Sequence, residues 1–170
     1  MSLIGSHAPE LLDALWPVDD FAAFWGQAKM FVAAWEGGVV ADPDLLCLRP
    51  LDSLLNEQRL LLATHRQNDA IHANDLLIAS ERRHRFWDGL ESDALRWLGT
   101  KPGKLLGAEF LAARAKDAAR FLRKEDWPAL AEPVWFGASL ADATRHSAPW
   151  KIRASVTLES LLPNAYAIKV

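Results

Sequence analysis

Cysteine is nearly absent from this 170-residue sequence, which contains Cys47 alone. No disulfide can therefore form within the chain. No apolar run reaches the roughly 18 residues that a membrane-spanning helix needs, and the N-terminus lacks the basic and apolar regions of a secretory signal. These absences predict a soluble, cytoplasmic protein without a membrane span. Cys47 lies between two leucines, and we expect it to be a buried, unreactive thiol.

Long blocks of basic charge are missing as well. The formal net charge is -3, with basic and acidic residues interspersed along the chain. Nucleic-acid-binding proteins usually gather Lys and Arg into one patch, so we expect no nucleic-acid partner. The sequence has no Gly-rich phosphate loop and no Gly-x-Ser-x-Gly motif, and serine-hydrolase chemistry is therefore not indicated. His65, His72, His84 and His146 fall into no recognised metal-ligand spacing.

The sequence does have the composition of a globular domain. Hydrophobic residues make up 51% and charged residues 24% of the chain, and the length is ordinary for a single domain. We therefore predict one domain over residues 1–170. Apolar residues recur every three or four positions between residues 17 and 36, which predicts a helix. Gly37 and Gly38 are expected to end it.

Short strands are predicted after this helix. Residues 39–41 and 45–48 form two apolar runs on either side of an acidic turn, residues 60–64 and 76–79 form two more, and residues 166–170 look like a final strand. Apolar periodicity predicts helices near residues 86–98 and 105–122. Strands mixed with helices in this order predict an α/β fold, with a mixed sheet flanked by helices.

The acidic turn gives the clearest chemical signal. Asp42 and Asp44 lie one residue apart in an Asp-Pro-Asp turn that follows a predicted strand. Two carboxylates so placed can reach one divalent ion, directly or through water, because Mg²⁺ and Mn²⁺ prefer oxygen ligands. A solvated turn explains the same residues equally well, so the motif by itself leaves both interpretations open.

In its context the turn resembles the sugar-binding region of DXD-type (GT-A) glycosyltransferases, a group that includes mannosyltransferases and the clostridial glucosylating toxins. The likeness rests on a helix that ends in Gly37 and Gly38, on Asp42 and Asp44, and on the apolar run 45–51 that leads into a Pro-containing loop. It implies a partial GT-A-like sheet. It also implies a transferase that moves a sugar from a nucleotide-sugar donor to an acceptor that the sequence does not identify.

The resemblance also implies roles for individual residues. Asp42 and Asp44 would hold Mn²⁺ or Mg²⁺, and Asn74 and Asp75 would face the donor or acceptor sugar. In the family, the helix before the two glycines carries an Asp and, three residues on, an Arg; the matching residues here are a glycine and a lysine. The lysine would meet a phosphate as a point charge. The implied catalytic candidates are Asp42, Asp44 and Asp75, and the implied donor-binding residues are Lys29, Gly37, Gly38 and Asn74.

Most of the family's N-terminal nucleotide-binding strands have no counterpart before the helix, because roughly twenty residues are too few for a strand-helix-strand unit. We therefore expect a second copy of the chain, or a partner chain, to cover that side of the sheet. The alternative function is non-enzymatic: a structural or protein-binding module built on a degenerate glycosyltransferase scaffold.

Overall fold

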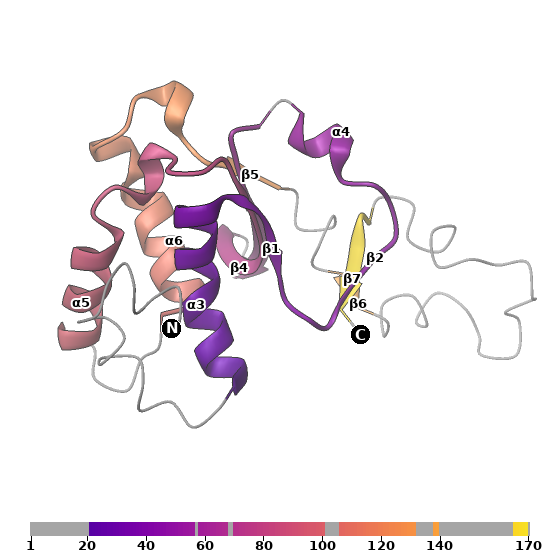
Figure 1. The fold of residues 1–170 in the computed structure, drawn as a ribbon, viewed down its shortest axis with the longest axis horizontal. Coiled ribbons are helices and arrows are strands. Elements are labelled where there is room, and N and C mark those ends of the chain that lie inside the picture. The colour runs from indigo at the N-terminus through magenta and orange to yellow at the C-terminus, as the bar shows by residue number, and fades with distance from the viewer. Residues whose placement is uncertain are drawn as a thin grey trace, which may run out of the picture.

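The computed structural model describes residues 21–56, 58–67, 70–100, 106–131, 138–139 and 165–169. Within these ranges the chain forms a four-stranded mixed sheet with helices packed on one face and a small three-stranded sheet on the other (Figure 1). This arrangement confirms the expected α/β class. None of the described helices is long and apolar enough to cross a membrane. The single domain over residues 1–170 stays a prediction, as does the covering of the N-terminal side, since residues 1–20 lie outside the described ranges.

Helix α3 (Phe21–Glu36) packs against the sheet as its apolar period predicts. Ala28 and Phe31 are buried in one core with Val40 and Ile78 of the sheet. Burial extends beyond this single face, however, because the side chains of Gln27, Lys29, Met30, Ala33 and Ala34 are also enclosed. The helix therefore carries a charged residue, Lys29, into a largely apolar layer.

Gly37 ends α3 for a steric reason. Its φ of +71° lies in the left-handed region that favours glycine, and its amide donates to the carbonyl of Ala33 at 3.1 Å. A Cβ at this position would stand 2.6 Å from the backbone nitrogen of Arg82. Any other residue would push the turn away from the end of the neighbouring strand.

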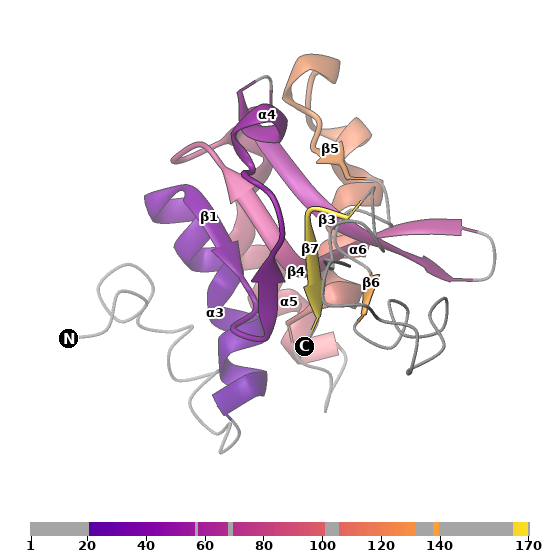
Figure 2. The same cartoon turned by 90° about the vertical axis from the view of Figure 1, so that its right-hand side faces the viewer.

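The main sheet consists of β1 (Gly38–Ala41), β4 (Ala70–Ser80), β3 (Leu60–Gln67) and β5 (Ala129–Leu130), in that spatial order. β4 runs antiparallel to both β1 and β3, whereas β5 runs parallel to β3. An irregularity between Leu62 and Thr64 shifts the register of the β3–β4 hairpin. Figure 2 shows the far half of this hairpin extending away from the rest of the sheet.

The helical layer includes α5 (Leu90–Thr100) and α6 (Ala108–Asp117), with short 3₁₀ turns η1 (Arg85–Trp87), η2 (Ala118–Arg120) and η3 (Lys124–Asp126). Buried Arg114 of α6 joins these pieces. Its Nε donates to the carbonyl of Phe86 at 2.9 Å, its Nη2 donates to the carbonyls of Phe86 and Asp88, both at 2.6 Å, and its Nη1 pairs with Asp93. Arg114 thus fixes α6 to η1 and to the start of α5.

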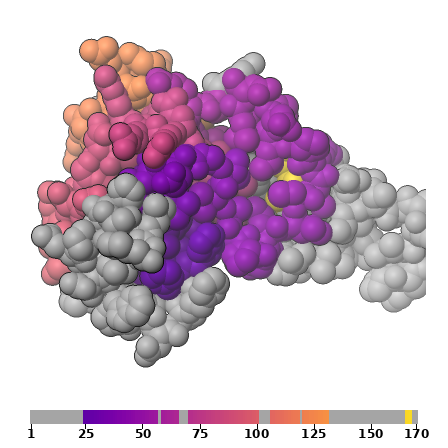
Figure 3. Space-filling model, in the orientation of Figure 1, coloured from indigo at the N-terminus to yellow at the C-terminus, as the bar shows by residue number. Residues whose placement is uncertain are grey.

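The second sheet consists of β2 (Leu45–Cys47), β7 (Ala167–Lys169) and β6 (Ala138–Ser139), and the short helix α4 (Asp52–Leu55) follows β2. β7 pairs antiparallel with β2 and parallel with β6. Only a small part of β7 is visible in Figure 3, where residues of the first half of the chain surround it. β1 belongs to the main sheet and β2 to the second sheet, so the two strands around the acidic turn lie in different sheets.

One expectation about this region was wrong. Cys47, expected to be buried, is exposed. β2 is a short strand, and Leu46 beside Cys47 is also exposed. An apolar run of leucines does not by itself distinguish a buried strand from one with a solvent-facing side.

Candidate functional site

Lys29 is a buried cation whose partners lie far away in sequence. Its side chain is 1% exposed. Its ammonium nitrogen contacts Oδ1 of Asp42, lies 3.3 Å from Oδ2 of Asp75, and donates to the main-chain carbonyl of Asp75. Removing an ammonium group from water costs several kcal/mol unless oppositely charged and hydrogen-bonding groups surround it. Asp42 and Asp75 supply both kinds of partner.

Strand pairing brings these partners together. β1 ends at Ala41, which pairs with Leu77 of β4, and the amide of Asp42 donates to the carbonyl of Leu76 at 2.9 Å. Asp42 therefore leaves β1 beside the stretch of β4 that contains Asp75. We call Lys29, Asp42 and Asp75 the Lys29 cluster.

Asp75 sits where three elements meet. Its Oδ2 lies 3.5 Å from the place that a Cβ on Gly26 of α3 would occupy, and 3.8 Å from the corresponding place on Gly107. Gly107 is the N-cap of α6, and the positive end of a helix dipole favours a carboxylate. Neighbouring Asn74 accepts a hydrogen bond from the amide of Leu76 at 3.0 Å through its Oδ1, in the part of β4 where the pairing with β3 is irregular.

Both carboxylates of the cluster remain partly accessible to solvent. The side chain of Asp42 is 22% exposed and that of Asp75 is 19% exposed, although the ammonium between them is enclosed. One positive and two negative formal charges leave the cluster with a net charge of -1. The cluster therefore presents carboxylate oxygens toward solvent over a buried cation.

A divalent metal ion fits this arrangement in part. Each carboxylate has about four lone-pair positions, and the contacts with Lys29 occupy Oδ1 of Asp42 and Oδ2 of Asp75. Mg²⁺ is commonly bound through one or two carboxylates, with water and substrate phosphates completing its shell. Within the described ranges no group of three or more His, Cys, Asp or Glu side chains is arranged to hold a metal, so the described residues offer the pair Asp42 and Asp75.

The structure pairs Asp42 with a different acid from the one expected from sequence, and the metal role of Asp42 and Asp44 stays a prediction. Asp42 is brought together with Asp75, whereas Asp44 lies two residues further along a turn closed by the amide of Leu45 and the carbonyl of Asp42, at 3.1 Å. The Asp-Pro-Asp spacing suggested a shared ligand role, but strand pairing sets the geometry. No local signal in the sequence links Asp42 to Asp75; the register of β1 on β4 does.

Two further expectations meet a different geometry. Gly37 and Gly38, expected to bind the donor, lie at the start of β1, while Asp42 follows its end. Four residues of strand separate them by roughly 13 Å. Lys29, expected to meet a phosphate, is enclosed by its aspartate partners. A phosphate could reach it only by displacing them.

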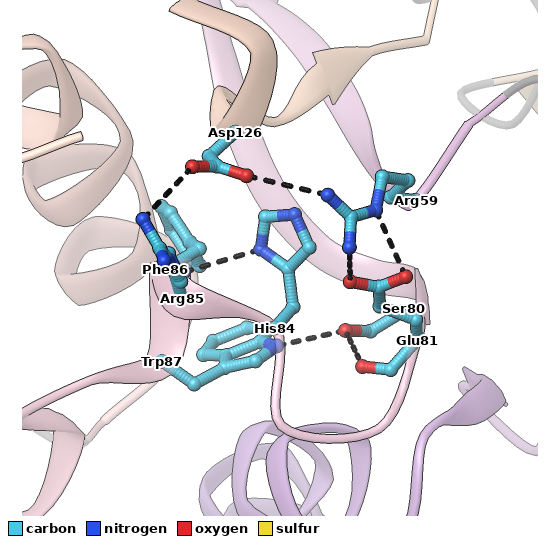
Figure 4. Close-up of polar contacts among 8 residues, drawn as sticks. All are labelled: Arg59, Ser80, Glu81, His84, Arg85, Phe86, Trp87 and Asp126. Atoms are coloured by element: carbon cyan, nitrogen blue, oxygen red, sulfur yellow. Dashed lines mark hydrogen bonds and ion pairs between the residues drawn. The ribbon is translucent and has the colours of Figure 1, made fainter. Parts of the chain in front are cut away.

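A second group of charged residues lies near the C-terminal end of β4, at Ser80 and Glu81 (Figure 4). Arg59 makes a two-point contact with Glu81, with Nε to Oε2 at 3.0 Å and Nη2 to Oε1 at 2.6 Å, and this contact raises the pKa of Arg59. Asp126 lies 3.4 Å from Nη1 of Arg59 and 3.8 Å from Nη1 of Arg85. Its charge is therefore balanced within the group.

His84 lies in the middle of this second group. Its Nδ1 accepts a hydrogen bond from the amide of Phe86 at 3.1 Å and so caps η1. Burial lowers the pKa of His84 below its ordinary value of 6.5, and Glu81 offsets part of that effect. The imidazole is therefore neutral at pH 7. The charges of this second group are paired, and His84 serves as a cap. The group therefore holds η1 and η3 to the sheet, and we assign it a structural role.

Sequence reasoning did not anticipate an apolar hollow beside α6. It has a volume of about 520 Å³, and its lining residues include Ile71, Ala112, Lys116, Trp127 and Leu130. Ile71, Trp127 and Leu130 are each between 44% and 49% exposed. Three large apolar side chains so exposed around one hollow indicate a contact surface. Its members come from β4, α6 and the segment around β5, so no short motif could reveal it.

Comparison with known proteins gives no relative for this chain. No family model matches the sequence, and no curated protein or solved structure is significantly similar to it. The function is therefore argued from the geometry of the described residues.

Proposed function

We propose that the protein binds a divalent cation together with a nucleoside diphosphate group at the Lys29 cluster, and acts there as a metal-dependent transferase on a nucleotide-sugar donor. The observation that carries this proposal is the convergence of Asp42 and Asp75 on one buried nitrogen while both carboxylates stay partly exposed. The resemblance of residues 37–50 to the DXD region supports the choice of donor.

Each residue of the cluster has a distinct part. Asp42 and Asp75 hold the cation through the carboxylate oxygens that Lys29 does not engage. Lys29 acts as a positioning residue, because its ammonium contacts both carboxylates on their buried side and reduces their mutual repulsion. When bound, Mn²⁺ or Mg²⁺ supplies Lewis-acid stabilisation of the charge that develops on a leaving diphosphate.

Electrostatics explains why the cation and the diphosphate should bind together. A diphosphate alone would meet a cluster with a net negative charge and be repelled. With a divalent ion on Asp42 and Asp75, the same surface becomes positive and attracts phosphate oxygens. Affinity for the diphosphate should be weak, about 0.1 to 1 mM, which corresponds to roughly -4 to -5.5 kcal/mol.

The test is a calorimetric titration of uridine and guanosine diphosphates with and without Mn²⁺. We expect Mn²⁺ to strengthen binding in the unmodified chain, and Asp42→Asn and Asp75→Asn each to abolish that effect. Asp44→Asn is the matched control, since Asp44 carries the same charge two residues from Asp42, and we expect it to keep most of the enhancement. If Asp44→Asn removes the enhancement and Asp75→Asn does not, the pair inferred from the sequence holds the metal. Binding that ignores Mn²⁺ would refute the proposal.

The apolar hollow favours a second candidate function, a structural module that self-associates. The hollow carries exposed apolar side chains at its rim, so a two-fold arrangement can place Trp127 of each copy in the hollow of the other. Sedimentation velocity at high micromolar concentration tests this candidate. We expect a dimer that Trp127→Ser dissociates, while Leu46→Ser, a change at an equally exposed leucine of β2, leaves it intact. A monomer at all concentrations would rule this function out.

A further inference from the structure

Two histidines face each other across the far half of the β3–β4 hairpin. His65 of β3 and His72 of β4 are directly opposed in the antiparallel register. Side chains at opposed positions point to the same side of a hairpin, with Cβ atoms about 4.5 to 5.5 Å apart. The centres of the two imidazole rings lie 5.7 Å apart, and the ring planes are inclined by 32°.

Both rings open onto one hollow. His65 and His72 line a space of about 330 Å³ together with Glu109 and Ala112 of α6, and both side chains are only partly buried. An ion from solvent can therefore reach the ring nitrogens. Glu109 adds negative charge beside the pair, which favours a cation.

The spacing of the rings suits a shared metal ion. Two imidazoles on one tetrahedral Zn²⁺, with Zn–N bonds of about 2.0 to 2.1 Å, have ring centres roughly 5 to 5.5 Å apart. The observed separation of 5.7 Å lies close to this range. Imidazole nitrogen is a preferred ligand for Zn²⁺, Ni²⁺ and Cu²⁺ and a poor match for Mg²⁺.

We propose that His65 and His72 form a two-histidine site for a transition-metal ion such as Zn²⁺, with water and other solvent ligands completing its coordination. The site lies on the hairpin and uses different ligand chemistry from the Lys29 cluster, so it stands whether or not the proposed transferase function is correct. Bridging two strands at opposed positions would also pin the register of the hairpin's far half.

The sequence spacing of these histidines conceals the pair. Seven positions separate them, which matches no common metal-binding motif. Once the strands are paired, however, His65 stands opposite His72 just as Gln67 stands opposite Ala70 near the tip. Strand pairing in the hairpin therefore brings together two histidines whose spacing in the sequence indicates nothing.

The experiment is a Zn²⁺ titration of the full, tag-free chain, followed through the imidazole nitrogen resonances of its histidines in two-dimensional NMR. We expect the resonances of His65 and His72 to shift together and to saturate at one equivalent, while His84 and His146 stay unchanged below that ratio. Loss of a residue that only hydrogen-bonds a metal ligand costs roughly 10- to 100-fold in metal affinity. His65→Gln and His72→Gln each remove a ligand, and we expect each to weaken Zn²⁺ binding by more than that. His146→Gln is the matched control and should bind like the unmodified chain.

A second readout separates ligation from loss of fold. Zn²⁺ bound to the folded hairpin must raise the midpoint of thermal unfolding, and this rise should disappear in each Gln variant while the midpoint without Zn²⁺ stays close to that of the unmodified chain. A shift of only one of the two histidines, or Zn²⁺ binding unchanged in both variants, would overturn the proposal.

Discussion

Two cations are buried among the residues that the structure describes, Lys29 and Arg114, and they are surrounded in different ways. Arg114 is held mainly by main-chain carbonyl groups of Phe86 and Asp88, with Asp93 as its carboxylate partner. Burial lowers the pKa of Arg114 and Asp93 offsets part of that effect. Lys29 is held by two carboxylates from other elements and by one carbonyl.

The partners decide what each cation can do. The carbonyl groups of Phe86 and Asp88 are taken up by their hydrogen bonds with Arg114. Arg114 therefore serves packing. Two carboxylates that remain about one-fifth exposed keep oxygens available for a ligand. A buried cation that contacts partly exposed acids therefore indicates a binding site more strongly than a buried cation among carbonyls does.

The largest effect should come from removing both acids of the Lys29 cluster. Asp42→Asn with Asp75→Asn leaves a buried ammonium without a carboxylate, and we expect the free energy of unfolding to fall by about 3 to 5 kcal/mol. Adding Lys29→Met should restore most of the loss, because no buried charge then remains. Urea unfolding followed by tryptophan fluorescence measures both changes. A double variant as stable as the unmodified chain, or a triple variant with no recovery, would contradict the assigned role of Lys29.

Arg114 should differ from Lys29, because removing its carboxylate partner should not restore the stability that is lost with the cation. Arg114→Leu leaves the buried carbonyls of Phe86 and Asp88 without donors, at a cost of about 2 to 4 kcal/mol in total. Adding Asp93→Asn should recover none of it, because the lost partners belong to the main chain. The same unfolding assay applies. Full recovery in the double variant would show that the ion pair, and not the carbonyl bonds, is what Arg114 contributes.

A smaller effect is expected from binding at the Lys29 cluster. A Mn²⁺ concentration tenfold above its dissociation constant should raise the free energy of unfolding by roughly 1.4 kcal/mol, since only the folded chain brings Asp42 and Asp75 together. Asp75→Asn should remove this increment, and Arg114→Leu should leave it in place. A Mn²⁺ increment equal in both variants would place the ion elsewhere.

The smallest effect concerns the second charged group, around His84. The pKa of His84 is lowered in the folded chain, so the unfolded chain binds more protons just below pH 6.5. The free energy of unfolding should therefore fall as the pH drops through that range. Well above pH 6.5 this contribution is constant. Asn at position 84 keeps a capping acceptor but cannot be protonated in this range. The slope of unfolding free energy against pH between 5 and 6.5 should therefore be flatter in His84→Asn, and an identical slope would exclude His84 as its source.

Local patterns in the sequence predicted much of the fold. The helix predicted over residues 17–36 is described over residues 21–36. Its end at Gly37 and the strands predicted at residues 39–41, 60–64 and 76–79 follow from apolar period and from glycine conformation. The partition of β1 and β2 into separate sheets did not follow, because it depends on β4 and β7, which come much later in the chain.

The candidate site was predicted in its residue types but not in its geometry. Lys29, Asp42 and Asp75 were all chosen from the sequence, yet their mutual contact depends on the register of β1 on β4. The pairing of His65 with His72 depends likewise on the β3–β4 register. Long-range strand pairing is the physical information that spacing in a single sequence lacks.

The most direct measurement of the proposed cation site is paramagnetic broadening of backbone amide resonances by substoichiometric Mn²⁺. Asp42 and Asp75 should broaden first, followed by Gly26 and Gly107, whose backbones lie beside the Asp75 carboxylate. Amides around Arg114 should stay sharp at the same ratio. Broadening centred elsewhere in the chain, or none near Asp75, would contradict the assignment of the Lys29 cluster as the cation site.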